Sequence, residues 1–103
     1  MEIEEPKTEL KITQHSIDRA KERFKWNETT LTKMANKAYN EGIKHSMAKG
    51  SLRKYIDKLW FQYKNCNNIR VYGEDLYFFA NTSLVTVYQL PQNLKKYAKY
   101  SKQ

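Results

Sequence analysis

Three side chains suited to chemistry on a phosphate group recur at intervals of four near the start of the chain: His15, Arg19 and Arg23. Residues four apart project from the same side of a helix, so these side chains would span about 80° of its surface. The apolar residues of the segment centre about 135° away on the same helical wheel. Because an imidazole can transfer a proton and a guanidinium can bind phosphate, the spacing predicts a site that acts on a phosphate backbone.

The role expected of His15 is proton transfer. A helix N-terminus and neighbouring cations both favour the neutral imidazole, which can take a proton from a ribose 2′-hydroxyl. Arg19 and Arg23 would stabilise the charge that develops on phosphorus. The alternative is structural: His15 would be a capping or surface residue, and the arginines would anchor the helix through Asp18, Glu22 or the sheet.

A second set of candidate side chains lies in the β-rich C-terminal half. In the segment Leu84–Leu90, period-two alternation places Thr86 and Tyr88 on one face. Arg70 and Tyr72 alternate in the same way on an earlier strand. If the strands align, one sheet face carries hydroxyls, aromatic rings and an arginine, which can stack bases and hold phosphates. The alternative is that the rings belong to the core.

Other basic residues form less specific groups. Arg53 and Lys54 flank a third periodic segment, and Lys95, Lys96 and Lys99 lie close to the C-terminus. Charge runs of this kind usually form solvated faces. The alternative is that they extend a nucleic-acid-binding surface.

His45 lies between lysines in a predicted linker and is interpreted as a solvated loop residue, with a second proton-transfer group as the alternative. Two histidines thirty residues apart, without clustered carboxylates, do not predict a metal site. The chain also has no glycine-rich phosphate loop or nucleophile elbow. We therefore expect no metal and no cofactor.

The elements that must position these residues begin with helices. Thr13 is a candidate N-cap for a helix to about Lys25, and Asn27 can cap a second helix. Gly42 is expected to end that second helix in a left-handed conformation. After a linker over 45–50, Ser51 opens a third amphipathic segment whose apolar spacing favours a helix.

Short β-rich segments follow, separated by turn residues. They predict a three-stranded antiparallel meander over Ile69–Tyr72, Leu76–Ala80 and Leu84–Leu90. Helices before strands, without βαβ alternation, indicate an α+β fold. We expect two to three N-terminal helices packed on one face of a three- to four-stranded antiparallel C-terminal sheet.

A chain of 103 residues is the size of one domain. Residues 1–10 are predicted to form an acidic, flexible arm, residues 11–91 a single α+β domain, and residues 92–103 a basic tail. The formal net charge is +8, and residues 11–103 alone carry 18 basic and 7 acidic residues, a net charge of +11. Such a body attracts polyanions, although a lysine-rich surface from an A·T-rich genome is an alternative.

The location expected from the sequence is the cytoplasm. No apolar segment approaches the roughly 20 residues of a membrane span, and no secretory signal is evident. The single cysteine, Cys66, excludes an internal disulfide framework and fits a reducing compartment. We therefore expect no membrane association.

The motif Ile12-Thr13-Gln14-His15, followed by Arg19 and Glu22-Arg23, resembles the opening "I-T-x-H-x-x-x-R-x-x-E-R" of an uncharacterised family of small proteins from phages and Gram-positive bacteria. The strand segments from 67 to 91 resemble the rest of that pattern. The family is similar in layout to the RelE-like superfamily of ribonuclease toxins, grouped with barnase, EndoU and the nuclease colicins, which cut RNA without a metal.

This resemblance implies roles for individual residues. It implies His15 as base or acid, Arg19 and Arg23 as phosphate binders, and Arg70, Thr86 and Tyr88 as partners from the sheet. The segment from 45 to 63 has no counterpart in the better-known toxins, and a nuclease scaffold can be retained for binding alone.

Two functions are therefore expected. The first is a metal-independent endoribonuclease-like, RelE-like protein of phage or mobile-element origin, acting on RNA or the ribosome and partnered by an antitoxin. The second is a non-catalytic phage-encoded protein that inhibits a nucleic-acid-processing machine, such as an antiviral nuclease, in the manner of an anti-CRISPR protein. A structural or DNA-packaging accessory of a mobile element is a third alternative.

Overall fold

A computed structural model describes residues 9–100 of the protein, with side chains through residue 98. The chain forms an α+β fold in which helices precede the main strands, as predicted. The elements, in chain order, are β1 (Lys11–Ile12), α1 (Gln14–Phe24), α2 (Glu28–Glu41), β2 (Ile43–Lys44), the 3₁₀ turn η1 (His45–Met47), α3 (Gly50–Gln62), β3 (Asn68–Tyr72), β4 (Asp75–Ala80), β5 (Ser83–Gln89), the 3₁₀ turn η2 (Gln92–Leu94) and α4 (Lys95–Tyr100).

The sheet has five strands in the order β1-β5-β4-β3-β2. Its centre is the predicted antiparallel meander β3-β4-β5. Two short strands extend it: β1 pairs in parallel with the start of β5, and β2 pairs antiparallel with β3. Gly73 has φ +64° in the turn between β3 and β4, and Asn81 has φ 58° in the turn between β4 and β5. Glycine and asparagine tolerate this left-handed region, so the local sequence favours both hairpins.

Both predicted helix caps are confirmed. The Thr13 hydroxyl accepts a hydrogen bond from the Ser16 backbone amide at 3.2 Å, and the Asn27 side chain accepts one from the Thr30 amide at 2.8 Å. These bonds satisfy amides that lack partners in the first turn of a helix. Helix α1 ends when Lys25 turns left-handed at φ 62°.

Gly42 differs from the prediction. It is extended, with φ −67° and ψ 157°, and is not left-handed. A Cβ at this position would lie 2.4 Å from the Ala38 carbonyl oxygen and 3.1 Å from the Arg70 Cβ. Glycine is therefore required by the close approach of α2 to β3, and the chain leaves the helix directly into β2.

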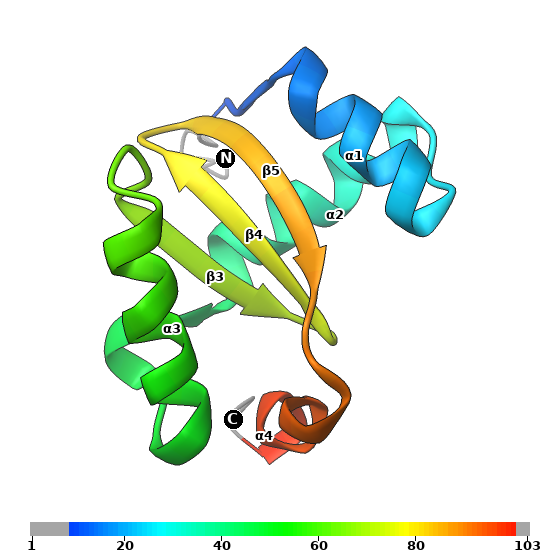
Figure 1. Ribbon diagram of the computed structural model, residues 1–103. Helices are drawn as coiled ribbons and strands as arrows, with labels where there is room; N and C mark the ends of the chain where they lie inside the picture. Colours follow the sequence, from blue (N-terminus) through cyan, green and yellow to red (C-terminus); the bar gives the residue numbers. More distant parts are fainter. Residues whose placement is uncertain (1–8, 101–103) are drawn as a thin grey trace, which may run out of the picture.

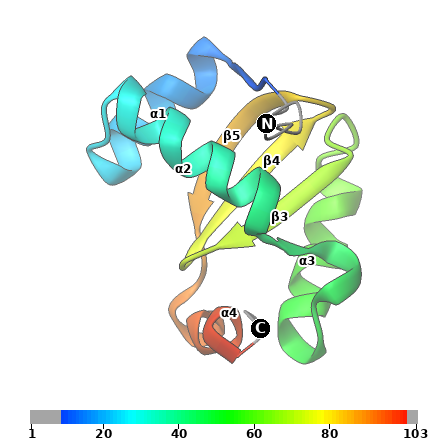
Figure 2. The same ribbon diagram turned by 180° about the vertical axis from the view of Figure 1, so that it is seen from behind.

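Helices cover both faces of the sheet. Helices α1 and α2 pack on the face that carries Tyr77 and Phe79, as predicted for the N-terminal helices. Helices α3 and α4 instead pack on the opposite face, which carries Leu76 and Phe78. Figure 1 shows α3 in front of the sheet and α2 behind it, and Figure 2 shows the reverse. Strand β4 is buried on both faces, which explains its nearly continuous apolar sequence.

The C-terminal segment is part of the folded core as far as the structure describes it. Leu94 in η2 is 5% exposed and Ala98 in α4 is 2% exposed, and both belong to the core on the α3 side. The predicted tail over 92–103 is therefore docked through residue 98. Of the predicted arm over 1–10, residues 1–8 lie outside the described residues. Within residues 9–100, no helix is long and apolar enough to cross a membrane.

Candidate nucleic-acid interface

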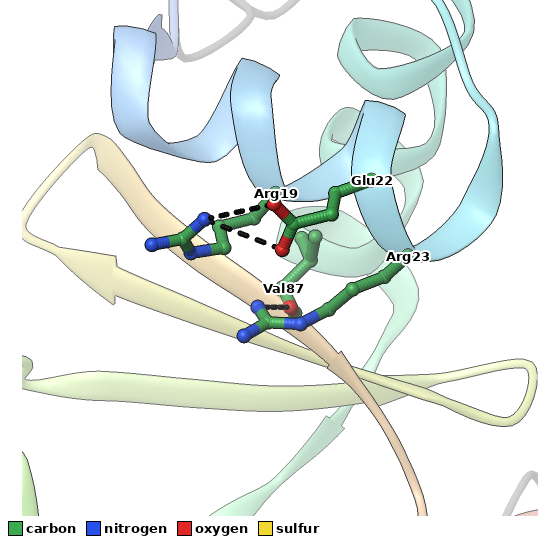
Figure 3. Close-up of polar contacts among 4 residues, drawn as sticks. All are labelled: Arg19, Glu22, Arg23 and Val87. Atoms are coloured by element: carbon green, nitrogen blue, oxygen red, sulfur yellow. Dashed lines mark hydrogen bonds and ion pairs between the residues drawn. The ribbon is translucent and has the colours of Figure 1, made fainter.

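Helix α1 runs beside β5 and is hydrogen-bonded to it at two points. The Thr13 hydroxyl donates to the Leu84 carbonyl at 2.6 Å, and Arg23 Nη1 donates to the Val87 carbonyl at 3.0 Å. Strand β1 pairs only with Ser83 and Leu84, so within residues 9–100 no strand lies along the rest of β5 on that side. Arg23 therefore supplies a hydrogen bond to a backbone carbonyl that has no strand partner at the edge of the sheet. We call this region the α1–β5 edge (Figure 3).

The same guanidinium contacts an aromatic ring of β5. The Arg23 Cζ lies 4.1 Å from the ring centroid of Tyr88, a cation–π distance. The Tyr88 hydroxyl lies 3.1 Å from the Tyr63 hydroxyl, which comes from the end of α3. Arg23, Tyr63 and Tyr88 thus link three elements that are far apart in the sequence.

Two tyrosine hydroxyls near this edge, those of Tyr63 and Tyr55, have raised pKa values. The hydrogen bond with Tyr88 is the largest cause that raises the pKa of Tyr63 to about 12, and burial adds to it. Burial also raises the pKa of the nearby Tyr55, and the proximity of Tyr88 adds to this. Neither Tyr55 nor Tyr63 can act as a phenolate base under ordinary conditions.

Arg19 also points from α1 toward β5 (Figure 3). Its Nη1 lies 3.4 Å from Glu22 Oε1, and the two side chains are 33% and 64% exposed. An ion pair this exposed contributes at most about 1 kcal/mol, so a phosphate can displace the carboxylate. Arg19 therefore offers a cation at this edge, next to the more firmly held Arg23.

His15 lies in the first turn of α1 and is exposed. Its spacing places it on the same side of the helix as Arg19 and Arg23. Among the described residues it has no hydrogen-bond partner, so no carboxylate fixes its orientation. The imidazole is accessible to a ligand but is not preorganised.

The two predicted sheet-side pairs lie on opposite faces of the sheet. Thr86 pairs with Phe78 and Tyr88 with Leu76, on the face covered by α3. The strand register instead puts Arg70 on the α2 face, opposite Tyr77, where Tyr72 also packs. The prediction that the two pairs could share a face is wrong, because the register between β3 and β4 matches Arg70 with the α2 face.

Thr86 and Arg70 each have surroundings that limit a role in binding. Thr86 is 2% exposed, and its hydroxyl has no hydrogen-bond partner among the described residues. A polymer cannot reach it in this structure. Arg70 donates to the Gly42 carbonyl at 3.0 Å and to Asn68 at 2.9 Å. These bonds fix Arg70 between α2, β2 and β3.

The remaining predicted basic residues are dispersed. Lys54 and Lys96 are exposed, and the Lys96 ammonium lies 5.4 Å from the Tyr97 ring centroid. Lys95 Nζ lies 3.7 Å from Glu74 Oε1. Arg53 bonds to Asp57 on its own helix. The side chain of Lys99 lies outside the described residues.

Sequence reasoning missed two features. Tyr55 and Tyr63 lie in the third amphipathic segment, whose apolar spacing predicts no polar role for them, although their hydroxyls could have indicated one. His45 was interpreted as a solvated loop residue, but its ring bonds to Asp57 and its side chain is only 24% exposed. That interpretation is wrong because η1 folds back onto α3. Within the described residues, no group of three His, Cys, Asp or Glu side chains could hold a metal ion.

No protein-family model, curated protein or solved structure matches this chain. The resemblance to RelE-like ribonucleases therefore stays a prediction. A function is therefore inferred from the geometry of the α1–β5 edge alone.

Proposed function

We propose that this protein binds single-stranded RNA along the α1–β5 edge. The observation that carries the proposal is the position of Arg23, which spans the edge between the Val87 carbonyl and the Tyr88 ring. A guanidinium has five donors, and among residues 9–98 the Arg23 side chain forms one hydrogen bond, to Val87. The others remain for phosphate oxygens, with Arg19 beside them as a second cation.

Aromatic side chains next to these cations support a single-stranded ligand. The Tyr88 ring, which Arg23 contacts, and Tyr63, whose hydroxyl lies 3.1 Å from that of Tyr88, are both partly buried against the core of the α3 face. Half-buried rings beside a basic edge can stack unpaired bases, whereas the stacked bases of a duplex are not accessible to them. The proposed RNA therefore lies with its phosphates on α1 and its bases toward the α3 side of β5.

The proposal extends to cleavage through His15. Its exposed imidazole would take the proton from a 2′-hydroxyl, and the 2′-oxygen would attack the adjacent phosphorus. The products would be a 2′,3′-cyclic phosphate and a 5′-hydroxyl, whose proton comes from solvent. Arg19 and Arg23 would stabilise the negative charge that develops on the phosphate.

A non-catalytic binding protein is the second candidate, and one observation favours it. Hydrogen bonding and burial raise the pKa of the Tyr63 hydroxyl to about 12, and Thr86 is buried, so neither is available as a proton-transfer partner for His15. A protein with this edge could occupy an RNA channel of a nucleic-acid-processing machine and inhibit it without cutting.

Binding is tested by fluorescence anisotropy with a labelled single-stranded oligoribonucleotide and its duplex. Arg19→Gln should weaken single-strand binding about five- to tenfold, because one phosphate contact is lost. Lys37→Gln is the matched control, since Lys37 is an exposed cation on α2 and should change affinity less than about twofold. Equal loss in both variants would mean that net charge, and not this edge, binds RNA.

Cleavage is tested with total RNA in the presence of EDTA. The wild-type protein should release fragments with cyclic phosphate ends, and His15→Ala should slow this about a hundredfold or more. If the wild-type protein binds RNA but leaves it intact, or if both proteins cut equally, the catalytic role is excluded and the binding function remains.

A further inference from the structure

A second polar site lies at the opposite edge of the sheet, where β2 pairs with β3. It is a pocket of about 300 Å³, lined by residues that include Lys44, His45, Arg53, Trp60 and Asn68. These residues come from β2, η1, α3 and β3. The sheet order places β4 and β3 between β5 and β2, so this site is separate from the α1–β5 edge.

One carboxylate orients the charged groups of the pocket. His45 Nε2 and Arg53 Nε both bond to Asp57 Oδ1, at 2.5 and 3.2 Å. The hydrogen bond with His45 is the largest cause that lowers the pKa of Asp57, and Arg53 lowers it further. Asp57 is therefore ionised at neutral pH, and it holds an imidazole and a guanidinium in fixed positions.

These groups retain unused binding capacity. Arg53 uses only its Nε toward Asp57, so both Nη nitrogens have no protein partner among the described residues. The Arg53 side chain is 45% exposed, and Lys44, which also lines the pocket, is exposed. One carboxylate against the two cations Arg53 and Lys44 leaves an excess of positive charge. The pocket is thus complementary to an anion, and its paired guanidinium nitrogens suit phosphate oxygens.

The pocket also offers an aromatic surface. The Trp60 ring is half-buried, and its centroid lies 5.0 Å from that of His45 with an angle of 32° between the planes. A tilted stack of this kind fixes the indole at the pocket wall. An indole beside two cations can bind a ligand that combines a flat ring with a phosphate.

We propose that this pocket binds a nucleoside monophosphate, with the phosphate on Arg53 and Lys44 and the base against Trp60. A volume of about 300 Å³ is at the small end of ligand pockets and suits one nucleotide. The ligand can be a free nucleotide or the phosphorylated end of an RNA strand. This inference does not rest on RNA binding at the α1–β5 edge.

The test follows the indole N–H cross-peak of Trp60 in a ¹H–¹⁵N NMR spectrum. The chain has two tryptophans, so a Trp26→Phe variant assigns the peak. Titration with AMP should shift it saturably, whereas adenosine and inorganic phosphate should each bind at least about tenfold more weakly. Arg53→Gln should weaken AMP binding about tenfold or more. Lys58→Gln, an exposed cation on the same helix, is the control and should change it less than about twofold.

Further arms distinguish the two ligand sources and guard against misfolding. If an oligoribonucleotide with a 5′-phosphate displaces AMP and its 5′-hydroxyl form does not, the ligand is the end of a strand. If AMP binds and neither oligoribonucleotide displaces it, the ligand is a free nucleotide. His45→Gln should also weaken AMP binding. If this variant unfolds, Arg53→Gln still tests the proposal, because the Arg53 side chain is exposed and its replacement should leave the fold intact. Three results would overturn the proposal. They are a Trp60 peak that does not move in about 10 mM AMP, an AMP affinity that Arg53→Gln leaves unchanged, and a loss of AMP binding in Arg19→Gln.

Discussion

Asp75, the first residue of β4, couples the stability of the fold to pH. Burial is the largest cause that raises its pKa from 3.8 to about 6, with Lys95 lowering it and Glu74 raising it. Because the folded-state pKa is above the unfolded one, the folded protein binds this proton more tightly. The resulting stability is present at low pH and is lost as the pH rises through about 6.

Replacing Asp75 by Asn should therefore stabilise the protein at about pH 8, by at most about 3 kcal/mol, and have little effect at about pH 4. Urea denaturation at both pH values measures the difference. Glu41→Gln removes an exposed carboxylate from the end of α2 and serves as the control. A stabilisation by Asp75→Asn that is equal at both pH values would contradict the role of ionisation.

Arg19 and Arg23 are both arginines on the same side of α1, but they differ in how much they stabilise the fold. Arg23 donates to the Val87 carbonyl and contacts the Tyr88 ring, whereas the bond that Arg19 makes among the described side chains is to an exposed glutamate. Arg23→Gln should lower the free energy of unfolding by about 1–3 kcal/mol and Arg19→Gln by less than about 0.5 kcal/mol. Denaturant titration of the two variants checks this, and equal effects would mean that the Val87 bond adds no stability.

At the scale of elements, the junction of α2 with β2 and β3 depends on Gly42. Its φ of −67° suits any residue, so a substitution would fail through contact and not through backbone strain. Gly42→Ala should destabilise the protein by about 1–3 kcal/mol, because its methyl group meets the Ala38 carbonyl at 2.4 Å. The decrease in melting temperature measures this loss of stability. A melting temperature equal to that of the wild type would show that α2 can move away from β3 without cost.

The docking of the C-terminal segment is a second property at this scale. Leu94 is 5% exposed and packs in the core of the α3 face. Leu94→Ala should destabilise the fold by about 2–4 kcal/mol, as expected for a buried leucine. Asn93→Ala is the control, because Asn93 is exposed in the same 3₁₀ turn. An effect no larger than that of the control would mean that the segment behaves as the tail expected from sequence.

At the scale of the whole molecule, the net charge of +8 favours a polyanionic ligand, and the number of phosphates contacted governs how binding responds to salt. Each phosphate contacted on a single strand adds about −0.7 to the slope of log affinity against log salt. With about three contacts, affinity should fall about twentyfold between about 50 and 200 mM NaCl. Arg19→Gln should make the slope about 0.7 shallower, which anisotropy titrations can measure. An unchanged slope would mean that Arg19 touches no phosphate.

Much of the local structure could be predicted from the sequence because it depends on neighbouring residues. Thr13 and Asn27 cap their helices through amides three residues away, and Gly73 and Asn81 tolerate the left-handed turns of the hairpins. Side-chain period alone also distinguishes the helices from the β3-β4-β5 meander.

Contacts between distant segments were decided only by the tertiary structure. Strand register put Arg70 on the face opposite Thr86, and the fold of η1 onto α3 brought His45 to Asp57. The sequence determined that His15, Arg19 and Arg23 share one side of a helix, because helical geometry is local. What that side faces depends on how α1 packs against β5, and this long-range contact leaves no periodic signal in the chain.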